Sequence, residues 1–277
     1  MRPLEARQAD SYVIDGGRAG AARLAMLARV RASASEDFVL RAGLAPGHRC
    51  LDLGCGSGEL TCRLAELAGP GEVVGMDFDP VVVSVAVERA GHARRTHAPR
   101  FVVGDIEALP DDLGEFDLVS ARYVLGHLRD PLAALRTMWS LCRPGGVVAV
   151  EDSDASAMSS EPHCPALDRC VELNEALAQA RGVAYGLGPR LVDLLPQAGF
   201  EGVEESVDQP VFGDGDGKRI TELTLDRKRA ALVAEGLVDD RELDAILAEL
   251  RQFSADPRTV MRAPRLHQVL GRRPAGS

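Results

Sequence analysis

The chain has 277 residues, of which 45% are hydrophobic and only 4% aromatic, and its formal net charge is −10. This length suits one α/β domain with helical additions, and the acidic balance argues against a protein that binds a phosphate backbone through Lys and Arg. A membrane span would need about eighteen consecutive apolar residues, which the chain lacks, and its first residues have no apolar signal-peptide core. We therefore expect a cytoplasmic protein with no nucleic-acid or membrane partner.

The six cysteines follow neither a disulfide framework nor a paired metal-ligand spacing, so no metal is expected.

The first part of the chain predicts a helical cap over residues 1–47. Leu24, Leu27 and Val30 recur at helical spacing within residues 17–30. A second helix is expected over residues 35–42, where Gly43 ends it. Two short helices before the first strand would cover one end of a sheet.

The middle of the chain alternates between strands and helices. Short buried strands are expected at residues 49–53, 72–76, 101–103, 116–120 and 147–150, with helices at 58–67, 81–90 and 130–142. Strands alternating with helices of this size predict a doubly wound parallel sheet with helices on both faces. We assign residues 48–152 to a cofactor-binding half.

The alternation of strands and helices ends after Asp152. Helices are expected at 165–181 and 188–198, a strand at 203–212, helices at 221–235 and 239–253, and a final strand at 265–272. Residues 213–264 look like a helical insertion between the last two strands that covers the site. Residues 153–277 would form the substrate-side half, and we expect the whole chain, 1–277, to be a single domain.

A glycine-rich turn, Leu51-Asp52-Leu53-Gly54-Cys55-Gly56-Ser57-Gly58, follows the first strand and opens a helix. Alternate glycines let the backbone turn sharply and approach a ligand closely, while the helix start offers free N–H groups. The spacing is G-x-G-x-G, and position 59 is Glu instead of the last glycine of the dinucleotide fingerprint.

Acidic residues end the next two strands. Asp77 can hold the two hydroxyls of a ribose, a feature that nicotinamide enzymes share. Asp105 can accept a hydrogen bond from the exocyclic amine of adenine, beside the apolar wall of Ile106. Together with the glycine turn, these positions predict a site for an adenine nucleoside.

The blocks LDLGCGSG, VVGMDFDP, VVGDIEALP, FDLVSARYVLGHL and RPGGVVAVED occur in one order over about residues 48–152. With them the sequence resembles the class I S-adenosylmethionine-dependent methyltransferases. The resemblance implies a seven-stranded, mostly parallel sheet whose last strand is antiparallel, with S-adenosyl-L-methionine as cofactor. It points to bacterial small-molecule members, with a small-molecule methyl acceptor in secondary metabolism as the partner, and allows for a homodimer.

The same resemblance implies where the cofactor lies. The glycines would face its methionine and ribose, Asp52 would reach its ammonium group through a water, and Asp77 would hold the ribose. Phe78 would stack on adenine, and Tyr12 would close over the carboxylate end. The implied cofactor-binding residues are Tyr12, Asp52, Gly54, Cys55, Gly56, Gly58, Asp77, Phe78, Gly104, Asp105, Ile106 and Arg122.

The acceptor should lie where the fourth and fifth strands end, since open parallel sheets bind ligands there. His127 is the best candidate for a catalytic base, because imidazole titrates near neutral pH, and Tyr123 is the second catalytic candidate. His127 could instead be a helix residue packed beside the cofactor. Glu151 or Asp152 could orient a basic or hydroxyl-bearing substrate, or one of them could cap the strand end. The candidate substrate-binding residues are Tyr123, His127, Glu151, Asp152, Asn174, Tyr185 and Arg190.

Two other functions stay open at this point. A nicotinamide-dependent oxidoreductase of the short-chain type would need Tyr-x-x-x-Lys, but Tyr123 is followed four residues later by His127. A protein that binds S-adenosylmethionine without transferring its methyl group would carry the same motifs. In-line methyl transfer to O, N or C of a small molecule is the function that the sequence favours.

Overall fold

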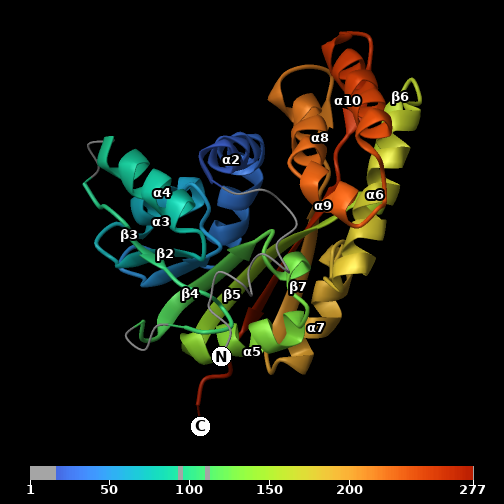
Figure 1. Cartoon of the computed structure of the whole chain (residues 1–277). Helices are drawn as coiled ribbons and strands as arrows, with labels where there is room; N and C mark the ends of the chain where they lie inside the picture. The colour runs from blue at the N-terminus through green and yellow to red at the C-terminus, as the bar shows by residue number, and fades with distance from the viewer. Residues whose placement is uncertain (1–16, 93–95, 110–112, 277) are drawn as a thin grey trace.

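Figure 1 shows a computed structural model of the chain, which describes residues 17–92, 96–109 and 113–276. Tyr12 lies outside these residues. A seven-stranded sheet runs through the centre in the order β3-β2-β1-β4-β5-β10-β7. The strands are β1 (Cys50–Leu53), β2 (Val73–Asp77), β3 (Arg100–Val103), β4 (Phe116–Arg122), β5 (Cys142–Asp154), β7 (Glu201–Asp208) and β10 (Arg265–Arg272).

The sheet confirms the predicted fold class. The first five strands pair in parallel, whereas β10, the last strand of the chain, is antiparallel to both of its neighbours, β5 and β7. The carboxyl ends of β1 to β5 therefore meet at one edge, and the residues that follow them are brought together there.

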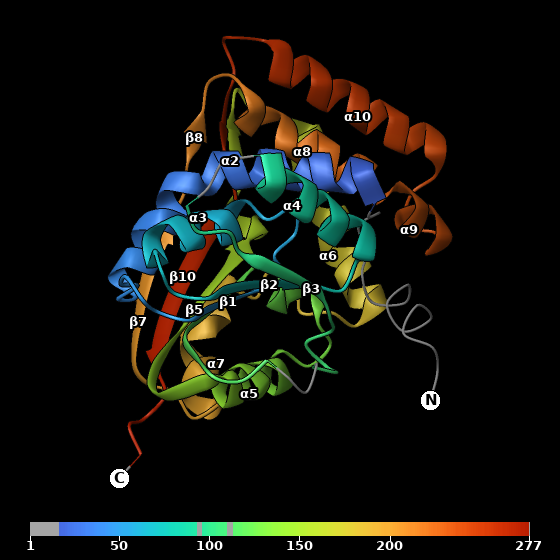
Figure 2. The ribbon, with the colours of Figure 1, turned by 90° about the vertical axis from the view of Figure 1, so that its left-hand side faces the viewer.

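Helices cover both faces of the sheet (Figure 2). The helices α2 (Gly17–Arg41), α3 (Glu59–Ala68) and α4 (Pro80–His92) lie on one side, and α5 (Pro131–Leu141) and α7 (Leu191–Gln197) on the other. Alternation along β1 explains this arrangement, because successive strand residues face opposite sides. Cys50 packs with Phe38 and Leu64, whereas Leu51 packs in the cluster of Leu135.

The helical cap is one helix and not the predicted two. α2 continues without interruption from Gly17 to Arg41. No Gly or Pro separates the two predicted segments, so nothing in the backbone ends the first one. Ser35, placed at the start of the second predicted helix, is instead buried within α2 and donates its hydroxyl hydrogen to Glu151 Oε1 (3.0 Å).

The C-terminal helices form a lid with an apolar cluster of its own, which includes Leu173, Leu225 and Leu247. The helix α8 contacts α2 across the site. None of the helices in the described part of the chain has the length and apolar character that a membrane crossing requires. The lid helices are α6 (Pro165–Arg181), α8 (Asp216–Asp226), α9 (Arg229–Ala234) and α10 (Asp240–Ala255).

A second, three-stranded sheet in the lid was not predicted. It consists of β6 (Ser159–Glu161), β9 (Val260–Arg262) and β8 (Val211–Phe212) in the order β6-β9-β8. The predicted strand over residues 203–212 is split into β7 and β8, with Pro210 between them, because proline cannot donate a ladder hydrogen bond. Short 3-10 turns complete the described chain at η1 (Leu125–His127), η2 (Ala155–Ala157) and η3 (Gly188–Arg190).

Candidate cofactor and acceptor cavity

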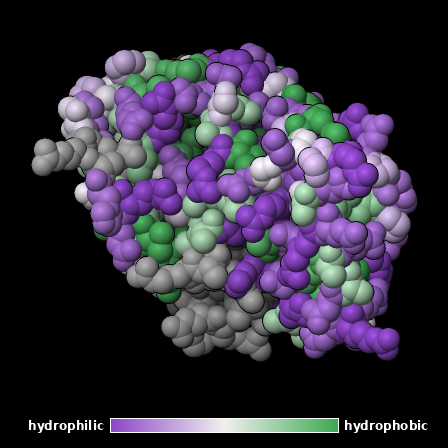
Figure 3. All heavy atoms as spheres, turned by 90° about the horizontal axis from the view of Figure 1, so that it is seen from above, coloured by the Kyte–Doolittle hydropathy of each residue, from purple (hydrophilic) through white to green (hydrophobic). Residues whose placement is uncertain are grey.

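A cavity of about 490 Å³ lies between the carboxyl edge of the sheet, α2 and the lid. One wall, here called the cofactor wall, comes from the loops after β1, β2 and β3, including Gly54, Asp77 and Asp105. The other, the acceptor wall, comes from the ends of β4 and β5 and from the lid, including Asp152 and Phe212. Seen from above, the molecule is covered mainly by hydrophilic residues, with smaller hydrophobic areas between them (Figure 3).

The glycine turn has the backbone that its residues allow. Gly54, Gly56 and Gly58 have φ angles of 65°, 55° and 80°, in the left-handed region that favours glycine. A Cβ on Gly54 would lie 2.3 Å from Cγ2 of Val124, so a side chain there would collide with the acceptor wall. Gly58 does not line the cavity; a Cβ there would meet the Phe101 ring at 2.9 Å, so its small size serves packing.

Asp77 braces the turn from the end of β2. Its Oδ2 accepts a hydrogen bond from Gly56 N (2.9 Å) and its Oδ1 one from Asp79 N (3.0 Å). Burial raises the pKa of Asp77 above its usual value. The carboxylate lines the cavity and retains lone pairs, so it can accept further hydrogen bonds from hydroxyl groups of a ligand.

The adenine part of the predicted site also lines the cavity. Phe78, Gly104, Asp105 and Ile106 are all among the lining residues, as are Cys55 and Arg122. Asp105 Oδ1 accepts from Glu107 N (2.9 Å), which fixes the turn after β3.

Asp52 lies behind the turn and not on the cavity wall. It is 2% exposed, and its carboxylate accepts from Thr61 Oγ1 (2.6 Å) and Ser120 Oγ (3.2 Å). Burial raises its pKa to about 6. The prediction that Asp52 reaches the cofactor through a water is not supported by this placement, because both carboxylate oxygens are directed to neighbouring elements.

The acceptor wall brings together Tyr123, His127, Asp152, Asn174 and Tyr185, all of which line the cavity. The backbone of Tyr123 has a φ of 57°, which non-glycine residues rarely adopt, and strain of this kind gathers at functional sites. The ring centroids of His127 and Tyr185 lie 6.1 Å apart.

Two of the titratable candidates on this wall, His127 and Asp152, have pKa values that bear on a base near neutral pH. Burial, followed by the charges of Lys228 and Arg23, lowers the pKa of His127 to about 3, so its imidazole is neutral at physiological pH. Burial raises the pKa of Asp152 to about 6, although its carboxylate accepts from the backbone N–H groups of Gly126 and Ser153, each at 2.8 Å.

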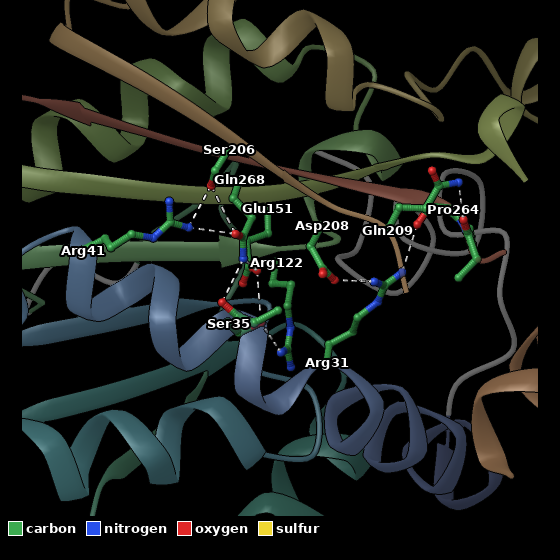
Figure 4. Close-up of polar contacts among 12 residues, drawn as sticks. Arg31, Ser35, Arg41, Arg122, Glu151, Ser206, Asp208, Gln209, Pro264 and Gln268 are labelled. Carbon is green, nitrogen blue, oxygen red and sulfur yellow. Dashed lines mark hydrogen bonds and ion pairs between the residues drawn. The ribbon is translucent and has the colours of Figure 1, made fainter. Parts of the chain in front are cut away.

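Glu151 and Arg190 do not reach the cavity. Glu151 alternates with Asp152 along β5 and so faces α2, where its Oε1 accepts from Ser35 Oγ (3.0 Å) and Gln268 Nε2 (2.8 Å). Figure 4 shows this cluster, in which Arg122 also donates to Ser35 Oγ (2.9 Å). Arg190 is exposed at the end of η3. Glu151 is therefore a structural link between β5 and α2, and the placement of Arg190 gives no support for acceptor binding.

Two arginines of α2 line the cavity and were missed by the sequence analysis. Arg31 donates hydrogen bonds to Asp208 Oδ2 (2.9 Å) and to the carbonyl oxygen of Pro264 (3.0 Å), as Figure 4 shows. Arg23 lies two turns earlier. The spacing of Arg23, Leu27 and Arg31 by four residues places them on one helix face, a signal that was present in the sequence.

Comparison with known proteins assigns the family. A model of the methyltransferase domain matches residues 44–198, more than half of the chain. The chain belongs to this family, whose class I members use S-adenosylmethionine.

The relatives and the fold agree with that assignment. The chain is 36% identical to a demethylmenaquinone methyltransferase of Lactococcus lactis subsp. lactis over 115 residues. This match covers 41% of this chain and 45% of the relative. The chain is also 36% identical to the chloroplastic 2-phytyl-1,4-beta-naphthoquinone methyltransferase of Arabidopsis thaliana over 120 residues. This match covers 42% of this chain and 46% of the relative. The chain thus spans about half the length of these curated relatives. The solved structure of a putative methyltransferase from Bacillus halodurans C-125 shares the fold, with a TM-score of 0.55 and 18% identity over 86% of this chain and 97% of that one.

Proposed function

We propose that this chain is an S-adenosylmethionine-dependent methyltransferase whose acceptor is a small molecule. The observation that carries the proposal is the single cavity that the cofactor wall and the acceptor wall share. A donor and an acceptor bound against these two walls would face one another in the same cavity. The comparisons favour neither an oxidoreductase nor a protein that only binds the cofactor.

The residues present fit the cofactor. The glycine turn brings its backbone to the cavity wall, and the carboxylates of Asp77 and Asp105 can accept from ribose hydroxyls and the adenine amine. Phe78 and Ile106 supply apolar surface for the base. When bound, this cofactor supplies an activated methyl group on a sulfonium, which a nucleophile can take while the sulfur keeps the bonding electron pair.

The task of the protein is then to align the acceptor and keep water out. α2 and the lid border the cavity, and apolar side chains such as Leu27, Met158 and Ile220 line it. Alignment of this kind contributes up to about 7–11 kcal/mol in intramolecular models.

An acceptor that enters protonated needs a base on the acceptor wall. With a pKa of about 3, His127 accepts a proton poorly and suits a neutral hydrogen-bonding role. Asp152, with a pKa of about 6, matches the requirement for a base that works near neutral pH better.

The acceptor named in the quinone relatives suggests an aromatic or quinol-like molecule, while an origin in secondary metabolism stays a prediction of the sequence. Function as one domain over residues 1–277, a cytoplasmic location and a homodimer are also proposals that rest on the sequence alone.

Calorimetric titration with S-adenosylmethionine, S-adenosylhomocysteine and NAD tests the proposed function. We expect saturable binding of the first two and none of NAD. Binding of NAD alone would refute the assignment, and methylation of no acceptor by a chain that binds the cofactor tightly would favour the binding-only alternative.

A further inference from the structure

Two buried basic side chains lie beside the cavity, one on its wall and one behind it. Arg23 of α2 lines the cavity and is only 7% exposed. Lys228, in the turn between α8 and α9, is 1% exposed and lies behind Asn174 and Tyr185. We call Arg23, Asn174, Tyr185, His127 and Lys228 the basic end of the cavity.

Arg23 is poorly satisfied by the protein. Its Nη1 donates to Thr224 Oγ1 over 3.4 Å, and its buried Nε has no partner among the described residues. No carboxylate within the described ranges forms an ion pair with it, in contrast to Arg31 on the same helix face, which is paired with Asp208. A buried guanidinium without a counter-charge is costly, because it loses its hydration and gains nothing equivalent.

Lys228 has polar partners, but none of the acids in the described part of the chain pairs with it. Its Nζ donates to Asn174 Oδ1 over 2.7 Å and lies 4.2 Å from the centroid of the Tyr185 ring. Because an ammonium group can only donate, it fixes the carbonyl oxygen of Asn174 on its own side. The amide NH₂ of Asn174 is then directed elsewhere, and its one recorded contact is a weak one of 3.6 Å to Cys170 Sγ, another residue of the cavity wall.

The nearest acid of the acceptor wall does not neutralise these cations. Both oxygens of Asp152 accept backbone N–H groups, and the charged residue that most affects its pKa is His267. The basic end therefore carries positive charge that the described residues leave uncompensated. An anion placed between Arg23 and the Asn174 amide would relieve the cost of burying both cations.

We propose that the methyl acceptor is a carboxylic acid with a small apolar body, and that its carboxylate binds between Arg23 and Asn174. Lys228 acts as a positioning residue, because it orients the Asn174 amide and adds positive charge behind it. The apolar body lies against Met158, Phe212 and Ile220, which line the same cavity. The proposal rests on the proposed function and specifies its substrate class.

The test uses 2-naphthoate and its neutral analogue 2-naphthamide as probes, titrated into the chain saturated with S-adenosylhomocysteine. We expect the carboxylate to bind at least about tenfold more tightly than the amide, the range for a hydrogen bond to a charged group. Arg23→Met should abolish this preference. The matched control is Arg29→Met, which removes an exposed arginine of the same helix that pairs with Asp216.

Lys228→Met has a readout that a purely structural role would not change. In the unmodified chain, affinity for naphthoate should fall as pH rises from 7 to 9, above the pKa of Asp152 of about 6, as the ammonium of Lys228 loses its proton. The groups that face it are Arg23 of α2, Asn174 and Cys170 of α6, Tyr185 and His127. In Lys228→Met this dependence should be flat, while binding of S-adenosylhomocysteine stays unchanged.

The outcomes separate the two proposals. Failure of the unmodified chain to bind S-adenosylhomocysteine counts against the proposed function itself. Binding of S-adenosylhomocysteine without binding of naphthoate, or with equal affinity for the acid and the amide, overturns the carboxylate site alone. Equal loss of preference in Arg29→Met and Arg23→Met overturns it too. Should Arg23→Met fail to fold, Arg23→Gln and the pH dependence of Lys228→Met decide the question.

Discussion

The cofactor wall and the basic end of one cavity handle charge in opposite ways. On the cofactor wall, Asp77 and Asp105 each accept hydrogen bonds from the backbone of their own turns. At the basic end, Arg23 and Lys228 are buried, and no acid among the described residues pairs with them. The first arrangement is complete in the protein alone and offers spare lone pairs to a ligand. At the basic end the described residues supply no counter-charge. A buried cation without a counter-charge indicates that a ligand supplies it.

The largest effect should come from breaking the cofactor wall. Asp77→Ala removes the acceptor at the ribose position and releases Gly56 N and Asp79 N. We expect affinity for S-adenosylhomocysteine to fall about a hundredfold or more, since hydrogen bonds to a charged group are worth roughly 1.5–3 kcal/mol each. Calorimetry measures the loss.

Asp117→Ala is the matched control for that experiment. Asp117 is also a partly buried strand aspartate with a backbone partner, Arg49 N at 2.8 Å, but it lies at the opposite edge of the sheet. Its loss should leave the affinity unchanged. Unchanged affinity in folded Asp77→Ala would remove the ribose assignment.

The cofactor wall and the basic end also differ in how far the sequence could predict them. The cofactor wall depends on short motifs, because its residues follow strand ends directly and the strand order brings them to one edge. Asp52 belongs to the same motif but lies behind the turn, since strand alternation and the bonds to Thr61 and Ser120 turn its side chain away. A motif fixes the position of the backbone better than the direction of each side chain.

The basic end has no such local rule. Arg23 could have been found from its helical spacing with Leu27 and Arg31, but Lys228 lies far away in the sequence, in a turn of the lid. Only packing of α2, α6 and α8 brings these residues to one place. The split of the strand at Pro210 and the small lid sheet depend on the same long-range contacts, which no pattern within one segment contains.

A smaller effect is expected from His127 of the acceptor wall. His127→Ala should lower turnover about tenfold while leaving the affinity for S-adenosylhomocysteine within about twofold, a loss of one oriented hydrogen bond of roughly 1–1.5 kcal/mol. Steady-state kinetics and calorimetry on the same preparation check it, with His48→Ala as the control far from the cavity. Because the pKa of His127 is about 3, the pH profile should not change near pH 6.5. An equal fall in turnover and affinity would make His127 structural.

The last comparison concerns stability and sets two buried lysines side by side. Lys218 Nζ donates to the carbonyls of Gly213, Asp256 and Thr259 and to the Thr259 hydroxyl, at 2.6–3.2 Å. Lys228 has one such oxygen, from Asn174. Lys218→Met leaves several buried acceptors unsatisfied, at about 1–3 kcal/mol for each group, so it should lower the melting temperature at every pH.

Lys228→Met should behave differently, and its effect should depend on pH. Burial, together with the charge of Arg23, lowers the pKa of Lys228 to about 7 from a usual value of 10.5. Between these two values the unfolded chain holds a proton that the folded chain lacks, so the stability of the unmodified chain rises with pH across this window. Below pH 7 both states are protonated, and the full cost of the buried charge is present. Melting temperatures should therefore favour Lys228→Met most at pH 6, by up to several degrees, and the advantage should shrink by pH 9.5. A constant difference in melting temperature between the two chains across this range would mean that Lys228 carries no uncompensated charge. The contrast between the cofactor wall and the basic end would then rest on Arg23 alone.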